Sequence, residues 1–558
     1  MTDNDLPSDA SDAPERPSRR RIFQAAAATG LAAALPSAAV DAKTAVNTVA
    51  KAAAKPVSLD AKLREHVKNV VVIYLENRSF NNLFANFPGL ASPLAGLKPE
   101  QYQQKDVDGT TLPALPKIWG GMVPDAQTIG GTQYLIAEED IKGLPNAPFK
   151  LTTQDGKPLP ESVITRDLWH LFYQNQMQIN GGKNDGFVAW GNTGGMVMGY
   201  YGETATNLGL YQLARQYTLC DNFFMAAFGG SYLNHQFLVS ARPAEFKNAS
   251  GTAAKKKICV LADGDTGTRL AIAPDSPKSA MDGKPVYVND GSISPDGYVV
   301  NTMAPPYQPS WIKPAPGGDP NLASSNEAYY QPPQSHDTIG DLLSAKGVSW
   351  AWYGAGMQAA LDAKGGGPKP NFQYHHQPFN YFTQFAPGTR ARAEHLRDGG
   401  LGDSPLSNKF LADVVAGKLP AVTFYKPQGN LNLHAGYSDI ESGDQHVTNV
   451  IAHLQKSPQW KDMVVVIAFD ENGGWWDHVA PPKGDRWGPG SRVPAIIVSP
   501  YAKKGAVDHS FYDTTSILRF ISRLHGLPML EGIKVRNDAF AARGAPPPGD
   551  LTGALSFR

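Results

Sequence analysis

The run Met463-Val464-Val465-Val466-Ile467-Ala468-Phe469 leads directly into Asp470-Glu471-Asn472-Gly473-Gly474. Its successive apolar residues include three valines and an isoleucine, which predicts a strand buried on both faces. Such strands are typical of parallel sheets that helices cover on both sides. A second stretch has the same form, because Asn69-Val70-Val71-Val72-Ile73-Tyr74-Leu75 leads into Glu76-Asn77. The two stretches together predict an α/β fold.

Strands and helices alternate through the rest of the chain, most regularly in its C-terminal part. Apolar and amphipathic patterns predict further strands at 348–353, 421–425 and 494–498, and helices at 168–180, 232–240, 337–345, 446–455 and 514–525. Two stretches rich in Gly and Pro, near 95–160 and 244–335, interrupt this order. Alternating strands and helices are typical of βαβ units. We therefore expect one domain over 67–558, with a large, mainly parallel central sheet flanked by helices and two irregular insertions.

Composition narrows the class of protein. The 558 residues carry 51 Lys+Arg and 51 Asp+Glu, and this balance argues against a dedicated nucleic-acid binder, which would carry a basic excess. The 55 Gly and 45 Pro indicate many turns but are too few for a disordered or collagen-like chain. Cys220 and Cys259 are the only cysteines, which excludes a disulfide scaffold and a cysteine-rich zinc module. Whether these two thiols are bridged or free stays open.

The first 42 residues have the features of an export signal. Arginines at 19–21 precede an Ala-rich, mildly apolar run, and small residues follow at Ala39 and Ala42. Paired arginines before such a run resemble a twin-arginine signal; the alternative is an Ala-rich helix or a disordered tail. We expect export by the Tat machinery, a leader segment over 43–66 and a periplasmic or secreted protein. No later run reaches 18 apolar residues, so we expect no transmembrane span in the mature form.

Polar side chains follow directly on both of the apolar strands. Glu76 and Asn77 follow the first strand, and Asp470 and Glu471 follow the second. Ligands of open α/β sheets bind at the carboxyl ends of the strands, and oxygen-rich ligand sets suit hard divalent cations. The pattern predicts a divalent metal ion, of open identity, bound by these four residues. The alternative is that they cap the helices or loops that follow.

Gly229-Gly230-Ser231 precedes the helix predicted at 232–240. The two glycines allow the backbone to approach a ligand closely, and the N–H groups at the start of a helix favour an anion such as phosphate. A serine hydroxyl in this position is a nucleophile when a metal or a base activates it. Ser231 is therefore a candidate nucleophile, and the alternative is an N-cap serine.

Histidines in polar segments complete the candidate set. The candidates are His170, His375, His376 and His434. Imidazoles donate hydrogen bonds to phosphoryl oxygens and protonate leaving oxygens, although any single histidine is more often structural or solvent-exposed. The motifs Gly-x-x-x-x-Gly-Lys-Ser/Thr, His-Glu-x-x-His and Gly-x-Ser-x-Gly are missing, which argues against a P-loop protein, a zincin protease and an ordinary α/β-hydrolase.

Two segments resemble those of a known family. Residues 71–80 (VVIYLENRSF) and 469–482 (FDENGGWWDHVAPP) are similar to the motifs of the bacterial phosphoesterase family, which contains phosphocholine-preferring phospholipases C and AcpA-type acid phosphatases. The resemblance implies a fold similar to that of the alkaline phosphatase superfamily. It is closer to the acid phosphatases, because Ser231 stands where they have a serine nucleophile and His375-His376 resembles their adjacent histidine pair.

The resemblance also implies residue roles. It assigns metal binding to Glu76, Asn77, Asp470 and Glu471, nucleophilic attack to Ser231, and contacts with the phosphoryl oxygens or leaving group to His170, His375, His376 and His434. We therefore expect an exported, metal-dependent acid phosphatase that cleaves small phosphorylated substrates through a phosphoserine. Cationic histidines would favour activity at mildly acidic pH.

Two alternatives stay open. A phospholipase C would cleave the phosphodiesters of phosphatidylcholine-type lipids with the same core, and it would bind a choline headgroup in an aromatic cage. Such a cage would use Trp352, Tyr353, Trp475 and Trp476, whereas core packing is the other interpretation of these residues. The second alternative is a non-catalytic secreted binding protein, against which the intact set of candidate residues argues.

Overall fold

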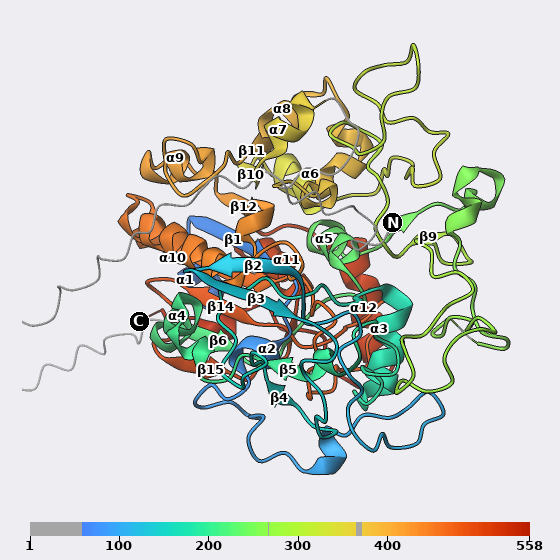
Figure 1. Ribbon diagram of the computed structural model, residues 1–558. Coiled ribbons are helices and arrows are strands. Elements are labelled where there is room, and N and C mark those ends of the chain that lie inside the picture. Colours follow the sequence, from blue (N-terminus) through green and yellow to red (C-terminus); the bar gives the residue numbers. More distant parts are fainter. Residues whose placement is uncertain (1–57, 266, 364–370, 558) are drawn as a thin grey trace, which may run out of the picture.

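An eight-stranded sheet forms the centre of the computed structural model, which describes residues 58–265, 267–363 and 371–557 (Figure 1). The predicted export signal at 1–42 and the first part of the leader predicted at 43–66 lie outside these ranges. In sheet order the strands are β11 (Leu396–Asp398), β10 (Trp350–Gly354), β12 (Val422–Lys426), β1 (Asn69–Leu75), β13 (Met463–Phe469), β14 (Ala495–Val498), β6 (Thr218–Cys220) and β15 (Ala506–Asp508).

The sheet is parallel except for β14, which runs antiparallel to both of its neighbours, β13 and β6. The other neighbouring pairs are all parallel. The strands predicted at 348–353, 421–425 and 494–498 correspond to β10, β12 and β14. The prediction of an α/β fold with a large, mainly parallel central sheet is therefore confirmed.

β1 and β13 lie side by side in the middle of the sheet, and every residue of both strands is buried. They pair in register from Asn69 opposite Met463 to Leu75 opposite Phe469. Because the two carboxyl ends coincide, the polar residues that follow these strands emerge at the same edge of the sheet. β12 pairs with the other side of β1 and runs in the same direction, so it ends at this edge as well.

Helices lie on two sides of the sheet: Figure 1 shows α10 and α4 to its left and α5 to its right. α10 packs against α4 and α9, whereas α11 packs against α1 and α5. The helices are α1 (Leu59–His66), α2 (Phe80–Phe84), α3 (Phe172–Ile179), α4 (Gly209–Gln216), α5 (Ser231–Ser240), α6 (Ile339–Ala345), α7 (Met357–Asp362), α8 (Arg390–His395), α9 (Lys409–Val415), α10 (Ile440–Lys456), α11 (Thr515–His525) and α12 (Glu531–Ala541).

Two helices begin four or more residues away from their predicted starts, whereas the other three begin within two residues of theirs. The helix predicted at 168–180 begins only at Phe172, because Leu171 is extended and the Phe172 N–H donates to Asn301 Oδ1 at 3.0 Å. This leaves His170 on an extended segment before the helix. The helix predicted at 446–455 is longer, because the Asp439 side chain caps the backbone N–H of Ser442 at 2.6 Å and starts α10 at residue 440.

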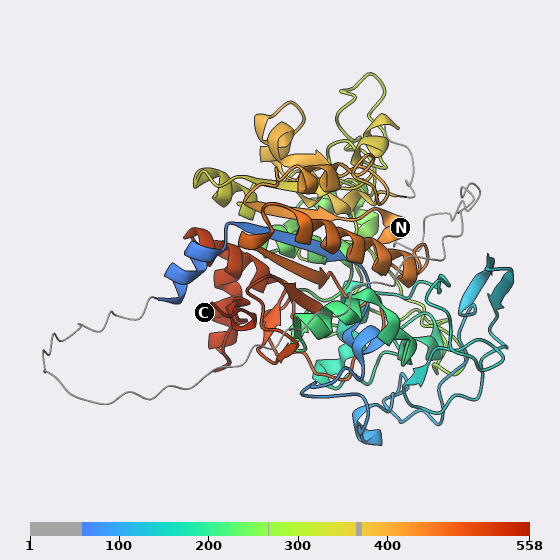
Figure 2. The ribbon, with the colours of Figure 1, turned by 90° about the vertical axis from the view of Figure 1, so that its left-hand side faces the viewer.

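The two predicted insertions are irregular. The stretch 95–160 contains an antiparallel hairpin that projects at the right-hand margin of Figure 2, formed by β2 (Val123–Ile129) and β3 (Thr132–Ile136). The stretch 244–335 forms long loops at the upper right of Figure 1 and carries two-residue strands, β8 (Ala244–Glu245) and β9 (Tyr298–Val299). The bounds of the single domain stay a prediction.

The structure also bears on the cysteines and on membrane spans. Cys220 and Cys259 are both buried and unbridged, so the free-thiol alternative holds. Across the residues described, no helix combines the length and the apolar character that crossing a membrane requires.

Candidate functional site

One carboxylate oxygen joins the carboxyl ends of β1 and β13. Oδ1 of Asp470 accepts the backbone N–H of Asn77 at 3.1 Å and that of Glu471 at 2.7 Å. Asn77 and Gly473 both have a φ of 60°, and a Cβ on Gly473 would lie 2.3 Å from the backbone oxygen of Asn77. The left-handed turn at Asn77 and the glycine that faces it therefore form one tightly packed corner.

Ser231 is the first residue of α5 and is fully buried. The N-cap residue is Gly230, so the interpretation of Ser231 as an N-cap serine is wrong. Its hydroxyl instead lies 3.1 Å from Asn77 Oδ1 and 3.4 Å from Glu471 Oε1, within hydrogen-bonding reach of both acceptors. Gly229 has a φ of 89°, and a Cβ there would lie 2.5 Å from a backbone nitrogen at the start of α3. The glycines thus let the chain turn and present Ser231 to the strand ends.

The hydrogen bonds of His170 and His434 fix the orientation of the Asn77 amide. Nδ1 of each ring contacts a backbone carbonyl oxygen, so the neutral rings carry their proton on Nδ1. The Nε2 lone pairs then accept from Asn77 Nδ2, at 3.4 Å for His170 and 2.8 Å for His434. This arrangement leaves Asn77 Oδ1 for the hydroxyl of Ser231.

Glu76 is surrounded by cationic and hydrogen-bonding partners. Its Oε1 lies 2.6 Å from Nζ of Lys426 and contacts Nε2 of His376. Its Oε2 accepts a hydrogen bond from the Tyr437 hydroxyl at 3.0 Å and lies 3.9 Å from Nε2 of His434. Burial alone would raise the pKa of this carboxyl, but His376 and Lys426 outweigh burial and hold the pKa of Glu76 well below its ordinary range.

Asp470 has the opposite electrostatics, although it is buried just as deeply. Burial and the negative charge of Glu76 raise the pKa of Asp470 to about 7. Its Oδ2 has no hydrogen-bond partner among the residues that the structure describes. Because buried polar atoms without a partner are rare in proteins, this oxygen indicates a place for a further positive group.

Three imidazoles, those of His235, His375 and His376, lie close to Glu76. Ring centroids are 5.4 Å apart for His235 and His375, 5.6 Å for His235 and His376, and 4.8 Å for the adjacent pair. A short 3-10 turn at Tyr374–His376 brings the two neighbouring rings together. Burial lowers the pKa of His376 to about 3 and that of His235 well below its usual value. These two rings are therefore neutral at mildly acidic pH.

The residues fit a metal ion on the chemistry of their donors. Within each of three groups, one donor atom per residue lies within 4.8 Å of the others: Glu76 with His235 and Asp470, Glu76 with His375 and His376, and Asp167 with His170 and His434. The predicted ligands Asn77, Asp470 and Glu471 offer oxygen atoms around Ser231, which suits a hard divalent cation. Glu76, the remaining predicted ligand, belongs to two of the groups but is also engaged by Lys426.

The structure brings all of the predicted site residues to one buried edge of the sheet. They come from the ends of β1 and β13, the start of α5, and the segments around positions 170, 375 and 434. Sequence analysis missed Lys426, His235 and Tyr437. Lys426 directly follows the apolar run predicted as a strand at 421–425, as Glu76 and Asp470 follow theirs, so the same signal identifies it. No comparable signal marks His235, which lies one helical turn after Ser231, or Tyr437.

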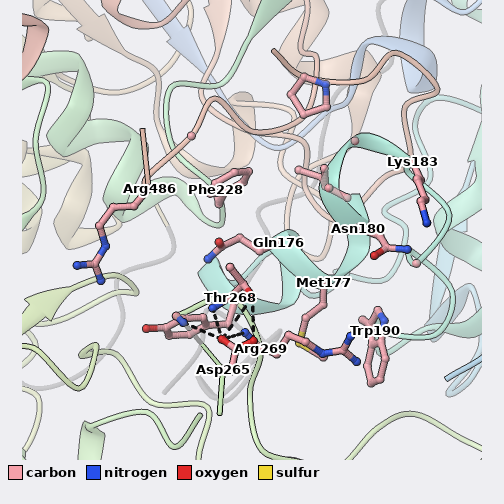
Figure 3. A pocket seen from close by; sticks show the side chains of 18 of the residues that line it. Gln176, Met177, Asn180, Lys183, Trp190, Phe228, Asp265, Thr268, Arg269 and Arg486 are labelled. Carbon is pink, nitrogen blue, oxygen red and sulfur yellow. Dashed lines mark hydrogen bonds between the residues drawn. The ribbon is translucent and has the colours of Figure 1, made fainter. Parts of the chain in front are cut away.

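A cavity of about 1120 Å³ adjoins the segment that carries Ser231 (Figure 3). It is lined by Gln176 and Met177 of α3, by Trp190, and by Phe228, which directly precedes the two glycines. The structure describes every predicted site residue, and none of them lines this cavity. The buried site is therefore closed to it in this conformation.

The four aromatic residues considered for a choline cage pack in the core. The exposed fraction of Trp352, Tyr353, Trp475 and Trp476 does not exceed 3%. Trp352 stacks on Phe424 with the ring centroids 5.4 Å apart. Core packing is therefore the interpretation that holds for these residues.

Two relatives among curated proteins are phospholipases C. Phospholipase C B of Mycobacterium tuberculosis is 24% identical over 529 residues, which cover 88% of this chain and 78% of that protein. Non-hemolytic phospholipase C of Pseudomonas aeruginosa is 30% identical over 177 residues, which cover 26% of this chain and 24% of that protein. Among solved structures, a protein of the alkaline phosphatase superfamily from Vibrio parahaemolyticus matches with a TM-score of 0.30 and 11% identity, covering 69% of this chain and 68% of that one.

The family model called Phosphoesterase family matches residues 67–528, which include every residue of the site. The match begins just before β1 and ends just after α11. It therefore spans the central sheet and both acidic strand ends. Because the match covers most of the sequence, the chain belongs to the Phosphoesterase family.

Proposed function

We propose that this phosphoester hydrolase is an exported, metal-dependent acid phosphatase in which Ser231 attacks the phosphorus atom of a small phosphomonoester. One observation carries the proposal: the buried Ser231 hydroxyl, at the start of α5, is within hydrogen-bonding reach of Asn77 Oδ1 and Glu471 Oε1. A helix N-terminus offers backbone N–H groups to the phosphoryl oxygens. The candidate nucleophile therefore lies next to backbone N–H groups that can bind an anion and to oxygen atoms that can bind a metal ion.

The metal part of the proposal rests on the oxygen atoms around Ser231. Asn77, Asp470 and Glu471, together with Glu76, would hold a divalent cation. Such a cation lowers the pKa of a serine hydroxyl and neutralises charge on the phosphoryl oxygens. The packed corner at Asn77 holds these side chains in place, and burial of the site keeps bulk water from them.

In the proposed reaction the ester bond is replaced by a serine phosphate. The Ser231 hydroxyl gives its proton to Glu471 Oε1, the carboxylate oxygen within reach, as its oxygen forms a bond to phosphorus. The bond between phosphorus and the leaving oxygen then breaks. A protonated histidine gives its proton to the leaving oxygen, and water then cleaves the phosphoserine to serine and inorganic phosphate. His434 is the preferred proton donor, because its Nε2 contacts Asn77, whose Oδ1 accepts from the nucleophile. For the transfer, Nε2 must first take up a second ring proton, and the Asn77 amide then no longer donates to it. His376 is a poorer donor, because burial lowers its pKa to about 3.

A phospholipase C is the second candidate, and the names of the relatives favour it. The same nucleophile and metal ligands would then cleave a phosphodiester, with a lipid headgroup as part of the substrate. Two observations favour the monoesterase. The four aromatic residues considered for a choline cage are buried in the core, and the site around Ser231 is enclosed by protein.

The nucleophile is tested with Ser231→Ala. We expect hydrolysis of p-nitrophenyl phosphate to fall at least about 10³-fold, because the covalent route is lost. Ser240→Ala is the matched control, since Ser240 is a buried serine at the other end of α5 whose hydroxyl donates to a backbone oxygen at 2.9 Å. Near-normal turnover in Ser231→Ala, with the control also active, would overturn the assignment.

Substrate class and metal dependence are tested together. Purified protein is assayed with p-nitrophenyl phosphate and p-nitrophenyl phosphorylcholine from about pH 4.5 to 8, before and after EDTA treatment. The proposal expects the monoester to be preferred and EDTA to abolish its hydrolysis. A preference for the choline diester would instead support the phospholipase C.

Export rests on residues 19–21 and is tested separately. Replacing the arginine pair Arg19 and Arg20 by lysines should retain the protein in the cytoplasm of a bacterial host, because twin-arginine signals need both guanidinium groups. Unchanged export of this variant would contradict the signal assignment while leaving the enzyme assignment intact.

A further inference from the structure

Lys426 is the only fully buried lysine among the residues that the structure describes. It is the last residue of β12, beside β1 in the sheet, and its Nζ lies 2.6 Å from Glu76 Oε1. The same Nζ lies 5.6 Å from the centroid of the Tyr74 ring. Burying an ammonium group costs free energy unless a negative partner compensates it. Glu76 is that partner, so the buried charge of Lys426 is compensated within the site.

The position of Lys426 matters because Glu76 belongs to two potential cation sites. In one it stands with His375 and His376, and in the other with His235 and Asp470. Imidazole donors next to a carboxylate suit zinc and similar transition metals. Any such ion would need an oxygen of Glu76, and the ammonium group already lies on Oε1.

The position of Lys426 makes a second cation beside Glu76 unfavourable. The ammonium group lies 2.6 Å from Glu76 Oε1 and is fully buried. A divalent ion bound by Glu76 and the imidazoles would therefore lie close to this positive charge, and two positive charges repel each other strongly in a buried place.

We propose that Lys426 acts as a fixed cation that holds Glu76 and reserves the site for a single divalent ion, by excluding a second ion from the imidazole side formed by His235, His375 and His376. Lys426 is thus a positioning residue, and it occupies the place of a second metal. The inference rests on the proposed function, because it requires the first metal ion near Ser231.

Zinc stoichiometry tests the inference. Metal-free wild type and Lys426→Met are titrated with Zn²⁺ by calorimetry, and the bound zinc is counted by mass spectrometry after gel filtration. We expect about one ion per chain for the wild type and about two for Lys426→Met, because the variant frees Glu76 for imidazole-assisted binding. Lys409→Met, which removes an exposed lysine paired with Asp398 at 2.8 Å, should stay at about one.

Two further measurements identify the second ion and guard against misfolding. The double variant Lys426→Met/His376→Gln should return to about one ion, because it lacks an imidazole donor. The wild type titrated with Co²⁺ should reach its endpoint at about one equivalent, with the weak visible absorption of oxygen-rich coordination. An endpoint near two equivalents in this titration would overturn the inference even when Lys426→Met does not fold.

The outcomes separate the inference from the proposed function. About two ions in the wild type, or about one in folded Lys426→Met, overturns the role of Lys426 while leaving the enzyme assignment untouched. Activity that survives EDTA treatment or the Ser231→Ala substitution overturns the proposed function. This result does not depend on the number of metal ions bound. A wild type that binds no zinc and no cobalt overturns both.

Discussion

Glu76 and Asp470 are the first residues after two neighbouring strands, and both are fully buried, but their carboxyls differ in chemistry. Lys426 and His376 hold the pKa of Glu76 well below its ordinary range. Burial and the charge of Glu76 raise the pKa of Asp470 to about 7. The neighbouring strands explain the difference: β12 ends in a lysine beside Glu76, whereas the antiparallel β14 begins with an alanine beside the end of β13.

The comparison shows that burial alone does not decide how a carboxylate behaves. Burial disfavours the charged form of both groups, and only Glu76 has a lysine in direct contact to offset it. The charge of Glu76 is therefore balanced by a side chain of the protein itself, Lys426. Asp470 keeps an oxygen without a hydrogen-bond partner among the described residues, and Lys426, which pairs with Glu76, offsets its burial only in part. Pairs of groups whose environments push their pKa values apart are typical of active sites.

Removing the charge of Asp470 should have the largest effect on activity. For Asp470→Asn we expect activity to fall at least about 10³-fold, roughly 4 kcal/mol in the barrier, with loss of metal binding. Stability in EDTA should rise at neutral pH, because asparagine can still accept the backbone N–H groups of Asn77 and Glu471 and removes a buried charge that the fold disfavours. Steady-state kinetics, metal analysis and denaturant unfolding measure the three quantities.

The pH dependence of stability sharpens this result. The fold raises the pKa of Asp470 from 3.8 to about 7, so it favours the protonated carboxyl. Metal-free wild type should therefore lose stability as the pH rises through that interval, and Asp470→Asn should lack this loss. Equal pH profiles of unfolding for the two proteins would contradict the assigned environment.

Removing the charge of Glu76 should instead destabilise the protein. Glu76→Gln leaves Lys426 buried without its anion, and breaking a buried ion pair by removing one partner costs about 3 kcal/mol or more. The double variant Glu76→Gln/Lys426→Met should recover much of this loss, because it removes the unpaired charge. Denaturant unfolding in EDTA measures the three variants, and a stable Glu76→Gln would show that Lys426 has another partner.

The corner that joins the two strand ends should be sensitive to one methyl group. Gly473→Ala places a Cβ 2.3 Å from the Asn77 carbonyl at a φ of 60°, so backbone must move and we expect a loss of about 2 kcal/mol with reduced kcat. Gly526→Ala is the control, because Gly526 has a φ of 62° with no atom within 4 Å of the added Cβ. It should cost about 1 kcal/mol and leave kcat unchanged.

Much of the fold follows from the sequence alone. The strands β1 and β13 match their predicted bounds, because the polar residues on either side of each long apolar run mark where a buried strand begins and ends. The start of α3 was misplaced, since it depends on Asn301, which is distant in sequence and accepts the Phe172 N–H. The single antiparallel strand β14 was also not foreseen, because strand direction depends on how the connections cross the sheet.

The site was predictable where its residues follow a buried strand or begin a helix. Glu76, Asp470 and Ser231 carry such local signals, and the structure brings them together. Residues that reach the site from other segments of the chain have weaker local sequence signals. His235 and Tyr437 approach the site only through the packing of their segments, and the buried pair of Lys426 with Glu76 depends on the order of strands in the sheet.

The smallest expected effect concerns His376, and it tests whether the ring that contacts Glu76 takes part in proton transfer. Because burial lowers the pKa of His376 to about 3, this ring is neutral throughout the working range. His376→Gln should therefore leave the midpoints of the pH–rate profile unchanged, even where kcat falls. His434→Gln should lower kcat more than His376→Gln does, because the proposal assigns leaving-group protonation to His434. A shifted midpoint in His376→Gln would mean that this ring titrates during turnover. The proton given to the leaving oxygen would then depend on His376 as well as on His434.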